Sequence, residues 1–145
     1  MDVVTQLAPG AMPTVQEDVV VLVVPADGGY LAVLRTATAG LAARLQFTLD
    51  EIEDLRIAVD EACAMLLTLA GVEATGGTEL TCQFQVTEES LSIEVAIPVR
   101  DDTALPSGQS FSWQVLTALA GEVTAESSGG QAAIRLTKRR APLTG

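Results

Sequence analysis

Apolar and polar positions alternate along the chain with the periods of helices and strands. The longest helical pattern runs from Thr48 to Ala70. Its apolar stripe consists of Ile52, Leu55, Val59, Cys63, Leu66 and Ala70, which recur every three or four positions as on one face of a helix. Thr48 followed by Glu51 is the sequence of a capping box, and Gly71 stands where a helix is expected to end. We therefore predict a long central helix with one buried face.

Two further segments have the period of a helix. The first runs from a cap at Asp27 through Gln46, and its apolar stripe contains Tyr30, Leu31, Leu34, Thr38, Leu41, Ala42 and Leu45. The second follows a cap at Ser110 and ends at Gly121, and its apolar stripe contains Phe111, Val115, Leu116 and Leu119. The helix that ends at Gln46 and the central helix that begins after Thr48 are thus expected to follow each other without a strand between them.

The remaining patterns are those of strands. Residues 19–24 are the run VVVLVV before Pro25, which predicts a strand either covered on both sides or lying at a sheet edge beside a partner. Residues 80–86 and 91–97 alternate between apolar and polar, which predicts a hairpin, and residues 122–137 predict a second one. The order β-α-α-β-β-α-β-β predicts an α+β fold, a two-layer sandwich with a mainly antiparallel sheet and helices on one face.

The chain is expected to form one domain, residues 18–138, between a flexible N-terminal leader, 1–17, and a flexible C-terminal tail, 139–145. Its N-terminus lacks the pattern of an export signal, and no apolar run approaches the roughly 18 residues of a membrane span. Cys63 and Cys82 both lie on predicted buried faces, which argues against a disulfide framework. These features favour a cytoplasmic protein that does not contact a membrane.

The charge of the chain excludes several functions. Its 145 residues include 19 acidic and 8 basic ones, for a net charge of -11, and no histidine. Nucleic-acid binding is therefore not expected as the main activity, because it requires clustered Lys and Arg. An acidic surface suits a basic protein partner such as a DNA-binding factor, although a solvated surface without that role is commoner. Without histidine, imidazole metal sites and Ser-His or Cys-His catalysis are excluded.

Glu61 is the acid of the central helix whose position needs an explanation. It shares the side away from the buried stripe with Ile57, Ala58, Met65 and Leu69, a mostly apolar surface. A carboxylate is unfavourable there unless it is solvated or paired. It is either a glutamate at the rim that reaches water or part of a site that faces a cleft.

The element order, together with IAVDEACAML and SGQSFSWQVLTALAGEV, resembles the RsbW-like anti-sigma factor and serine kinase family of the GHKL ATPase superfamily over residues 18–138. SFSWQVLTALAGEV is similar in particular to the actinobacterial branch. The resemblance implies a GHKL (Bergerat) fold and a homodimer. It also implies a protein that holds a sigma factor away from RNA polymerase and is captured in turn by an anti-anti-sigma factor of the STAS type. Active members phosphorylate that antagonist on a serine, using ATP.

The family's first nucleotide motif has a glutamate as general base and, four positions later, an asparagine that holds magnesium. The resemblance places the glutamate at Glu61, but Met65 stands at the asparagine position. A thioether is a poor ligand for a hard cation, so we expect magnesium-dependent ATP binding to be badly weakened. Glu61 is then either a vestige of the catalytic base or a residue with a remaining role.

Two other family motifs correspond to degraded segments. In the motif Asp-x-Gly-x-Gly the aspartate reads adenine; residues 99–104 retain Asp101 and Asp102 but neither glycine. The glycine-rich lid, whose backbone amides hold phosphates, corresponds to a segment in which only Gly108 remains. The resemblance marks these three residues as remnant cofactor-binding positions, and a solvated loop is the alternative for the two aspartates.

Arg35 and Arg44 of the first helix occupy the region that the family uses to grip the sigma factor, with a solvated helix face as the alternative. Trp113 either faces a partner or packs against the protein. The prediction is an anti-sigma factor that acts by binding, with no cofactor expected and with ATP and magnesium only if the pocket survives. The alternatives are an active serine kinase with Glu61 as base and a regulatory adaptor that has lost sigma capture.

Overall fold

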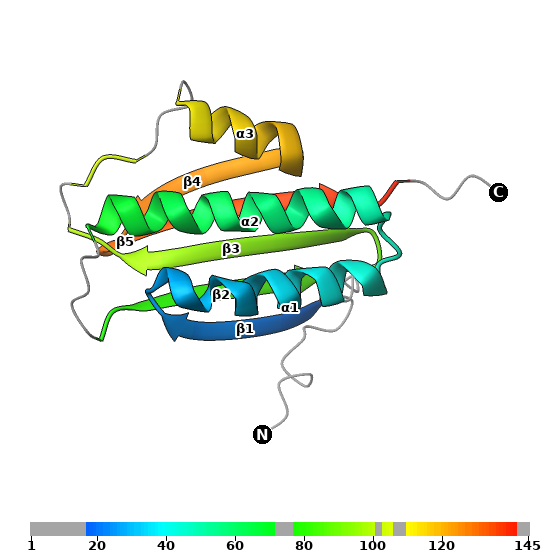
Figure 1. Ribbon diagram of the computed structural model, residues 1–145, viewed down its shortest axis with the longest axis horizontal. Coiled ribbons are helices and arrows are strands. Elements are labelled where there is room, and N and C mark those ends of the chain that lie inside the picture. Colours follow the sequence, from blue (N-terminus) through cyan, green and yellow to red (C-terminus); the bar gives the residue numbers. More distant parts are fainter. Residues whose placement is uncertain (1–16, 72–76, 101–102, 106–109, 142–145) are drawn as a thin grey trace, which may run out of the picture.

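The computed structural model describes residues 17–71, 77–100, 103–105 and 110–141. Its elements are β1 (Asp18–Pro25), the 3-10 turn η2 (Gly28–Tyr30), α1 (Leu31–Arg44), α2 (Leu49–Ala70), β2 (Glu79–Val86), β3 (Ser90–Pro98), α3 (Phe111–Ala120), β4 (Glu122–Ser128) and β5 (Gln131–Arg139). The strands form one sheet in the order β1-β2-β3-β5-β4, and every neighbouring pair is antiparallel. Figure 1 shows the helices over one face of this sheet. The predicted element order and two-layer α+β fold are confirmed.

The predicted ends of α2 and α3 are confirmed in atomic detail. The Thr48 hydroxyl accepts a hydrogen bond from the Glu51 backbone N–H (3.1 Å), and the Glu51 carboxylate accepts one from the Thr48 N–H (2.8 Å). Gly71 closes α2 with a φ of 63°, in the left-handed region that glycine adopts readily. At α3, the Ser110 hydroxyl accepts from the Trp113 N–H (3.1 Å).

Helix α1 is shorter than the periodicity predicts. The Asp27 carboxylate accepts a hydrogen bond from the Gly29 N–H (2.9 Å), but this caps the turn η2, and α1 itself begins at Leu31. At its other end α1 stops at Arg44, and Gln46 has a φ of 60°. That left-handed backbone is unfavourable for a residue with a Cβ, and it redirects the chain into α2.

The core lies between the helices and the sheet. The sheet buries Leu80, Cys82, Phe84, Leu91, Ile93, Val95, Ile97, Ala132, Ile134 and Leu136, and the helices bury Leu34, Ala42, Leu55, Val59, Leu66 and Leu116. The predicted stripes were wrong at Phe111, which is 81% exposed, and at Tyr30, which is 45% exposed. Both residues lie at a helix N-terminus, where the Cβ points back beyond the end of the helix.

Strand β1 lies at the sheet edge, one of the two predicted positions, and pairs with β2. Val20, Leu22 and Val24 pack against the core. Val19, Val21 and Val23 point to the opposite face of the sheet and are about half exposed (50%, 51% and 52%). No described helix covers that face (Figure 1).

The two cysteines are buried and free, as predicted. Burial raises the pKa of the Cys82 thiol to about 12. Burial also raises the pKa of the Cys63 thiol, and the nearby Cys82 and Asp60 raise it further. Both thiols are therefore protonated in the folded state at neutral pH. Among the described helices, none is long and apolar enough to cross a membrane.

Candidate functional site

Helices α2 and α3 form a pocket of about 320 Å³. It is lined by Glu61, Ala64, Met65, Thr68 and Leu69 from α2, by the α3 N-cap residue Ser110 and by Ser112 from α3. The α2 residues are three or four positions apart, so they share one face of the helix. The volume is at the lower end of the range for small-molecule pockets, about 300–1,000 Å³. The structure thus places Glu61 and Met65 together in a cleft.

Glu61 is partly exposed, and its carboxylate makes no hydrogen bond or ion pair with a described residue. Met65 and Leu69 lie with it in the pocket, as expected from the sequence. Ala58, expected on the same side, is fully buried, because α2 lies between α1 and α3 and its buried face is wider than one stripe. The carboxylate therefore faces a largely apolar wall with its hydrogen-bonding capacity unused within the described residues.

The described lining does not fit a magnesium–nucleotide complex. Magnesium requires near-octahedral oxygen coordination at about 2.0–2.1 Å. One turn after the Glu61 carboxylate the wall presents the Met65 thioether, which a hard cation does not favour. Besides the Glu61 carboxylate, the side-chain oxygens that line the pocket are the neutral hydroxyls of Thr68, Ser110 and Ser112. Asp101, Asp102 and Gly108, the other predicted remnants, lie outside the described residues.

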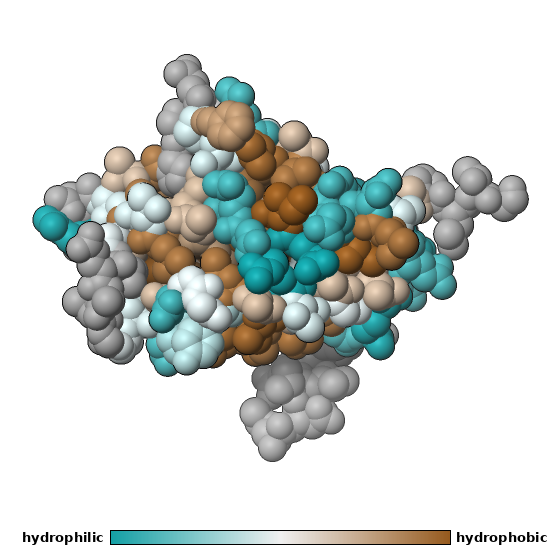
Figure 2. All heavy atoms as spheres, in the orientation of Figure 1, coloured by the Kyte–Doolittle hydropathy of each residue, from teal (hydrophilic) through white to brown (hydrophobic). Residues whose placement is uncertain are grey.

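Arg35, predicted to contact a partner, is held within the chain. Its Nη1 donates to Oδ1 of Asp60 at 2.7 Å, which joins α1 to α2. The two side chains are 34% and 40% exposed. Figure 2 shows hydrophilic side chains over the middle of α2, the helix that contains Asp60. One hydrogen bond leaves most of the guanidinium donors available.

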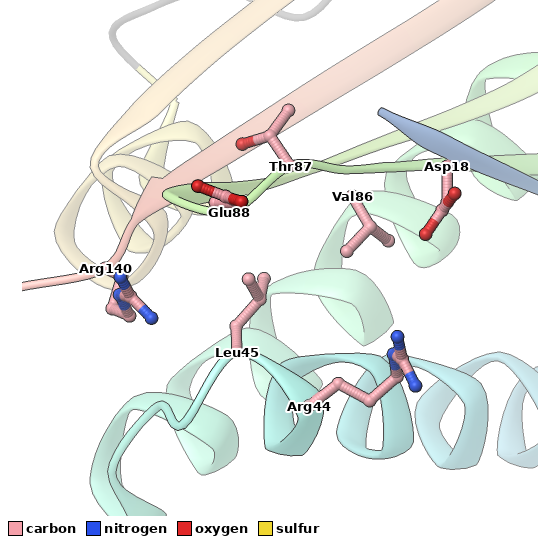
Figure 3. A pocket seen from close by; sticks show the side chains of 7 residues that line it. All are labelled: Asp18, Arg44, Leu45, Val86, Thr87, Glu88 and Arg140. Atoms are coloured by element: carbon pink, nitrogen blue, oxygen red, sulfur yellow. The ribbon is translucent and has the colours of Figure 1, made fainter. Parts of the chain in front are cut away.

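Arg44, the other predicted partner residue, lies at the end of α1 and lines a separate hollow of about 350 Å³. Figure 3 shows its side chain and that of Arg140 on either side of Leu45. Val86, Thr87, Glu88 and Asp18 complete the lining. Neither guanidinium forms an ion pair or a hydrogen bond with a described residue. Arg44 is thus exposed and uncommitted, in contrast to Arg35.

Sequence reasoning missed several residues at these sites. Ala64 and Thr68 stand three and seven positions after Glu61, so helical spacing alone places them on its face. Ser112 and Arg140 carry no such signal, because they arrive through the packing of α3 and the path of the chain after β5. Trp113, left open between packing and partner contact, is partly buried against the core.

Residues 24–138 match the family described as histidine kinase-like ATPase domain. The chain belongs to this family. The match confirms the membership of the GHKL superfamily that the sequence motifs predicted.

The relatives include serine-protein kinases named RsbW. The chain is 40% identical over 79 residues to RsbW of Bacillus subtilis (strain 168), covering 54% of this chain and 49% of that protein. It is 35% identical over 98 residues to RsbW of Bacillus mycoides (strain KBAB4), covering 68% and 54%. The chain therefore spans about half the length of the curated relatives it matches.

A solved structure, of the RsbU and RsbW domains of Rv1364c from Mycobacterium tuberculosis, has the same fold. It matches with a TM-score of 0.61 at 14% identity, over 84% of this chain and 32% of that one. At this identity the similarity supports the fold.

Proposed function

We propose that this chain is an anti-sigma factor that acts by protein binding and not by phosphoryl transfer. The observation that carries the proposal is the pocket between α2 and α3, in which Met65 and Leu69 adjoin Glu61. The similarity of the chain to RsbW proteins supports this class of regulator, and the Met65 thioether in the pocket wall argues against a bound magnesium ion. Glu61 is then a vestige of a catalytic base.

In this proposal the chain is cytoplasmic, and the helical layer holds a sigma factor away from RNA polymerase. Arg44 is the favoured contact because its guanidinium is exposed and unpaired among the described residues. Arg35 contributes through the donors that Asp60 leaves available. An anti-anti-sigma factor of the STAS type releases the sigma factor by competing for an overlapping surface, so relative affinity carries the signal.

We extend the proposal to a homodimer built on β1. An edge strand offers unpaired backbone groups to another strand. A two-fold axis through Val21 would place Val19 opposite Val23 of the second copy in an antiparallel pair, on the same face of the joined sheet. Val21→Lys is expected to give monomers by sedimentation equilibrium, whereas Thr117→Lys, at an exposed position on α3, remains dimeric. Dimers of both variants would contradict this arrangement.

The test of the main proposal combines calorimetry and capture. At 2 mM ATP with magnesium, a Kd of about 20 µM would raise the free energy of unfolding by about 2.7 kcal/mol. We expect no heat of binding and no shift in melting temperature. The same chain is expected to capture a sigma factor from the source cell, with or without ATP. Micromolar ATP binding together with serine phosphorylation of a captured antagonist would refute the proposal, and failure to bind any sigma factor would favour the adaptor.

A matched pair of variants isolates the role of Met65. Met65→Asn restores the amide of the family motif, and Ala64→Asn places the same amide one position earlier in the same pocket wall. Nucleotide binding gained by Met65→Asn alone would show that the rest of the pocket survives. Binding by neither variant is the result expected if the other motifs have also lost their function.

The serine kinase is a second candidate because the hydroxyls of Thr68, Ser110 and Ser112 line the same pocket as Glu61. In that case one of these oxygens replaces the missing amide, and Glu61 accepts the proton of the attacking serine. Transfer of phosphate from ATP to a purified STAS antagonist, abolished by Glu61→Gln, would establish it.

A further inference from the structure

The pocket between α2 and α3 is suited to hold an apolar side chain of a binding partner. Ala64, Met65 and Leu69 supply much of its wall, and methionine adapts readily to the shape of whatever fills the space beside it. Figure 2 shows apolar side chains gathered over α3 and its border with α2. An apolar hollow with a few polar groups at its rim is the usual form of a binding site.

Phe111 adds a large apolar surface beside this pocket. It is 81% exposed, and its sequence neighbours Ser110 and Ser112 both line the pocket. An exposed aromatic ring next to an apolar hollow is typical of the anchor residues of protein–protein interfaces. The ring contributes little to the core, so it is available to pack against a partner.

Glu61 favours a positively charged group in the molecule that occupies the pocket. Its carboxylate lines the pocket and has no hydrogen-bond donor or cation among the described residues. A cationic side chain beside it would form a charge-assisted hydrogen bond. The chain as a whole carries a net charge of -11, which favours the approach of a basic protein.

We propose that the pocket receives a basic, apolar segment of the sigma factor, with an aliphatic side chain between Met65 and Leu69 and a Lys or Arg paired with Glu61. Phe111 packs over the inserted segment. This inference rests on the proposed function, since the occupant is the sigma factor captured there. The pocket that contains Glu61 and Met65 thereby becomes part of the protein interface.

The test compares two exposed apolar residues. Phe111→Ala is expected to weaken binding of the captured, purified sigma factor about ten-fold, whereas Leu49→Ala, 84% exposed at the start of α2, changes it less than about two-fold. Glu61→Lys is expected to weaken binding about ten-fold or more, and Glu61→Gln by less, because only the first adds a repulsive charge. Circular dichroism checks that each variant is folded.

A footprint on Met65 provides a second readout. Saturating sigma factor is expected to slow peroxide oxidation of the Met65 thioether about five-fold or more, as measured by mass spectrometry. Sigma binding that leaves Met65 oxidation and the affinities of the Phe111 and Glu61 variants unchanged would overturn this inference and leave the proposed function standing. Protection that rises with the concentration of the chain alone would assign the pocket to a second copy and overturn it. A chain that binds no sigma factor would refute both proposals.

Discussion

The ion pair between Arg35 and Asp60 joins the two long helices and offers a quantitative test. Its Nη1–Oδ1 distance is 2.7 Å, and the side chains are 34% and 40% exposed. Removing either side chain alone breaks the pair without opening the core. A double-mutant cycle with Arg35→Ala and Asp60→Ala therefore isolates their coupling energy.

The exposure of both groups sets the magnitude. Two unit charges about 4 Å apart interact by about 4 kcal/mol at an effective dielectric constant of 20 and by about 1 kcal/mol in water. Solvent screening and the ordering of two long side chains reduce this further, and measured exposed pairs give about 0.2–1 kcal/mol. Because this contact is short and partly shielded, we expect a coupling of about 0.5–1 kcal/mol.

Urea unfolding of the four proteins, at low salt and in 1 M NaCl, measures the coupling. We expect it to fall by more than half in 1 M NaCl, where the Debye length is about 3 Å. A coupling below about 0.2 kcal/mol, or above about 2 kcal/mol and unaffected by salt, would refute the reasoning. Sigma binding of the same variants adds a functional result: weakening by Arg35→Ala but not by Asp60→Ala would support direct contact through Arg35.

Three other perturbations have expected outcomes. Gly40→Ala in α1 should stabilise the protein by about 0.5–1 kcal/mol in urea unfolding, since no described atom beyond the two chain neighbours and the adjacent helix backbone lies within 4 Å of the new Cβ; a loss of stability would contradict the open space seen there. Thr48→Ala should cost about 1 kcal/mol in the same assay, because the Glu51 N–H loses its acceptor; an unchanged unfolding midpoint would show that water replaces the cap. The stability contributed by the protonated Cys63 and Cys82 is complete below about pH 9 and is lost as the pH rises toward their raised folded-state pKa values, by about 1.4 kcal/mol per thiol and pH unit. Cys82→Ala should therefore reduce the fall in stability between pH 9 and 10 compared with the unaltered chain, and an equal fall in both would contradict this assignment.

The sequence predicts what depends on neighbouring residues. The capping box of Thr48 and Glu51 and the end of α2 at Gly71 are set by side chains within one turn. The order of helices and strands follows from periodicity. The predicted burial of Phe111 was wrong, because periodicity identifies an apolar position without indicating whether another element packs against the helix at that position.

Contacts between distant segments were not predictable in the same way. Strand β5 lies between β3 and β4, and nothing in the pattern of either hairpin indicates that insertion. The ion pair of Arg35 with Asp60 spans 25 positions, and the hollow around Arg44 depends on Arg140. Glu61 could be recognised as unusual, but the pocket it faces requires the packing of α3 on α2.

The two buried thiols allow the opening of the protein core to be measured. Cys63 of α2 and Cys82 of β2 are inaccessible to solvent where the helical layer meets the sheet. A thiol reagent can reach them only when these layers separate, so the rate of labelling measures how often the core opens. A partner bound across α2 and α3 would stabilise the closed state and slow that reaction. The labelling rate of the unaltered protein, measured with and without the partner, therefore shows whether binding of the partner slows the opening of the core or leaves it unchanged.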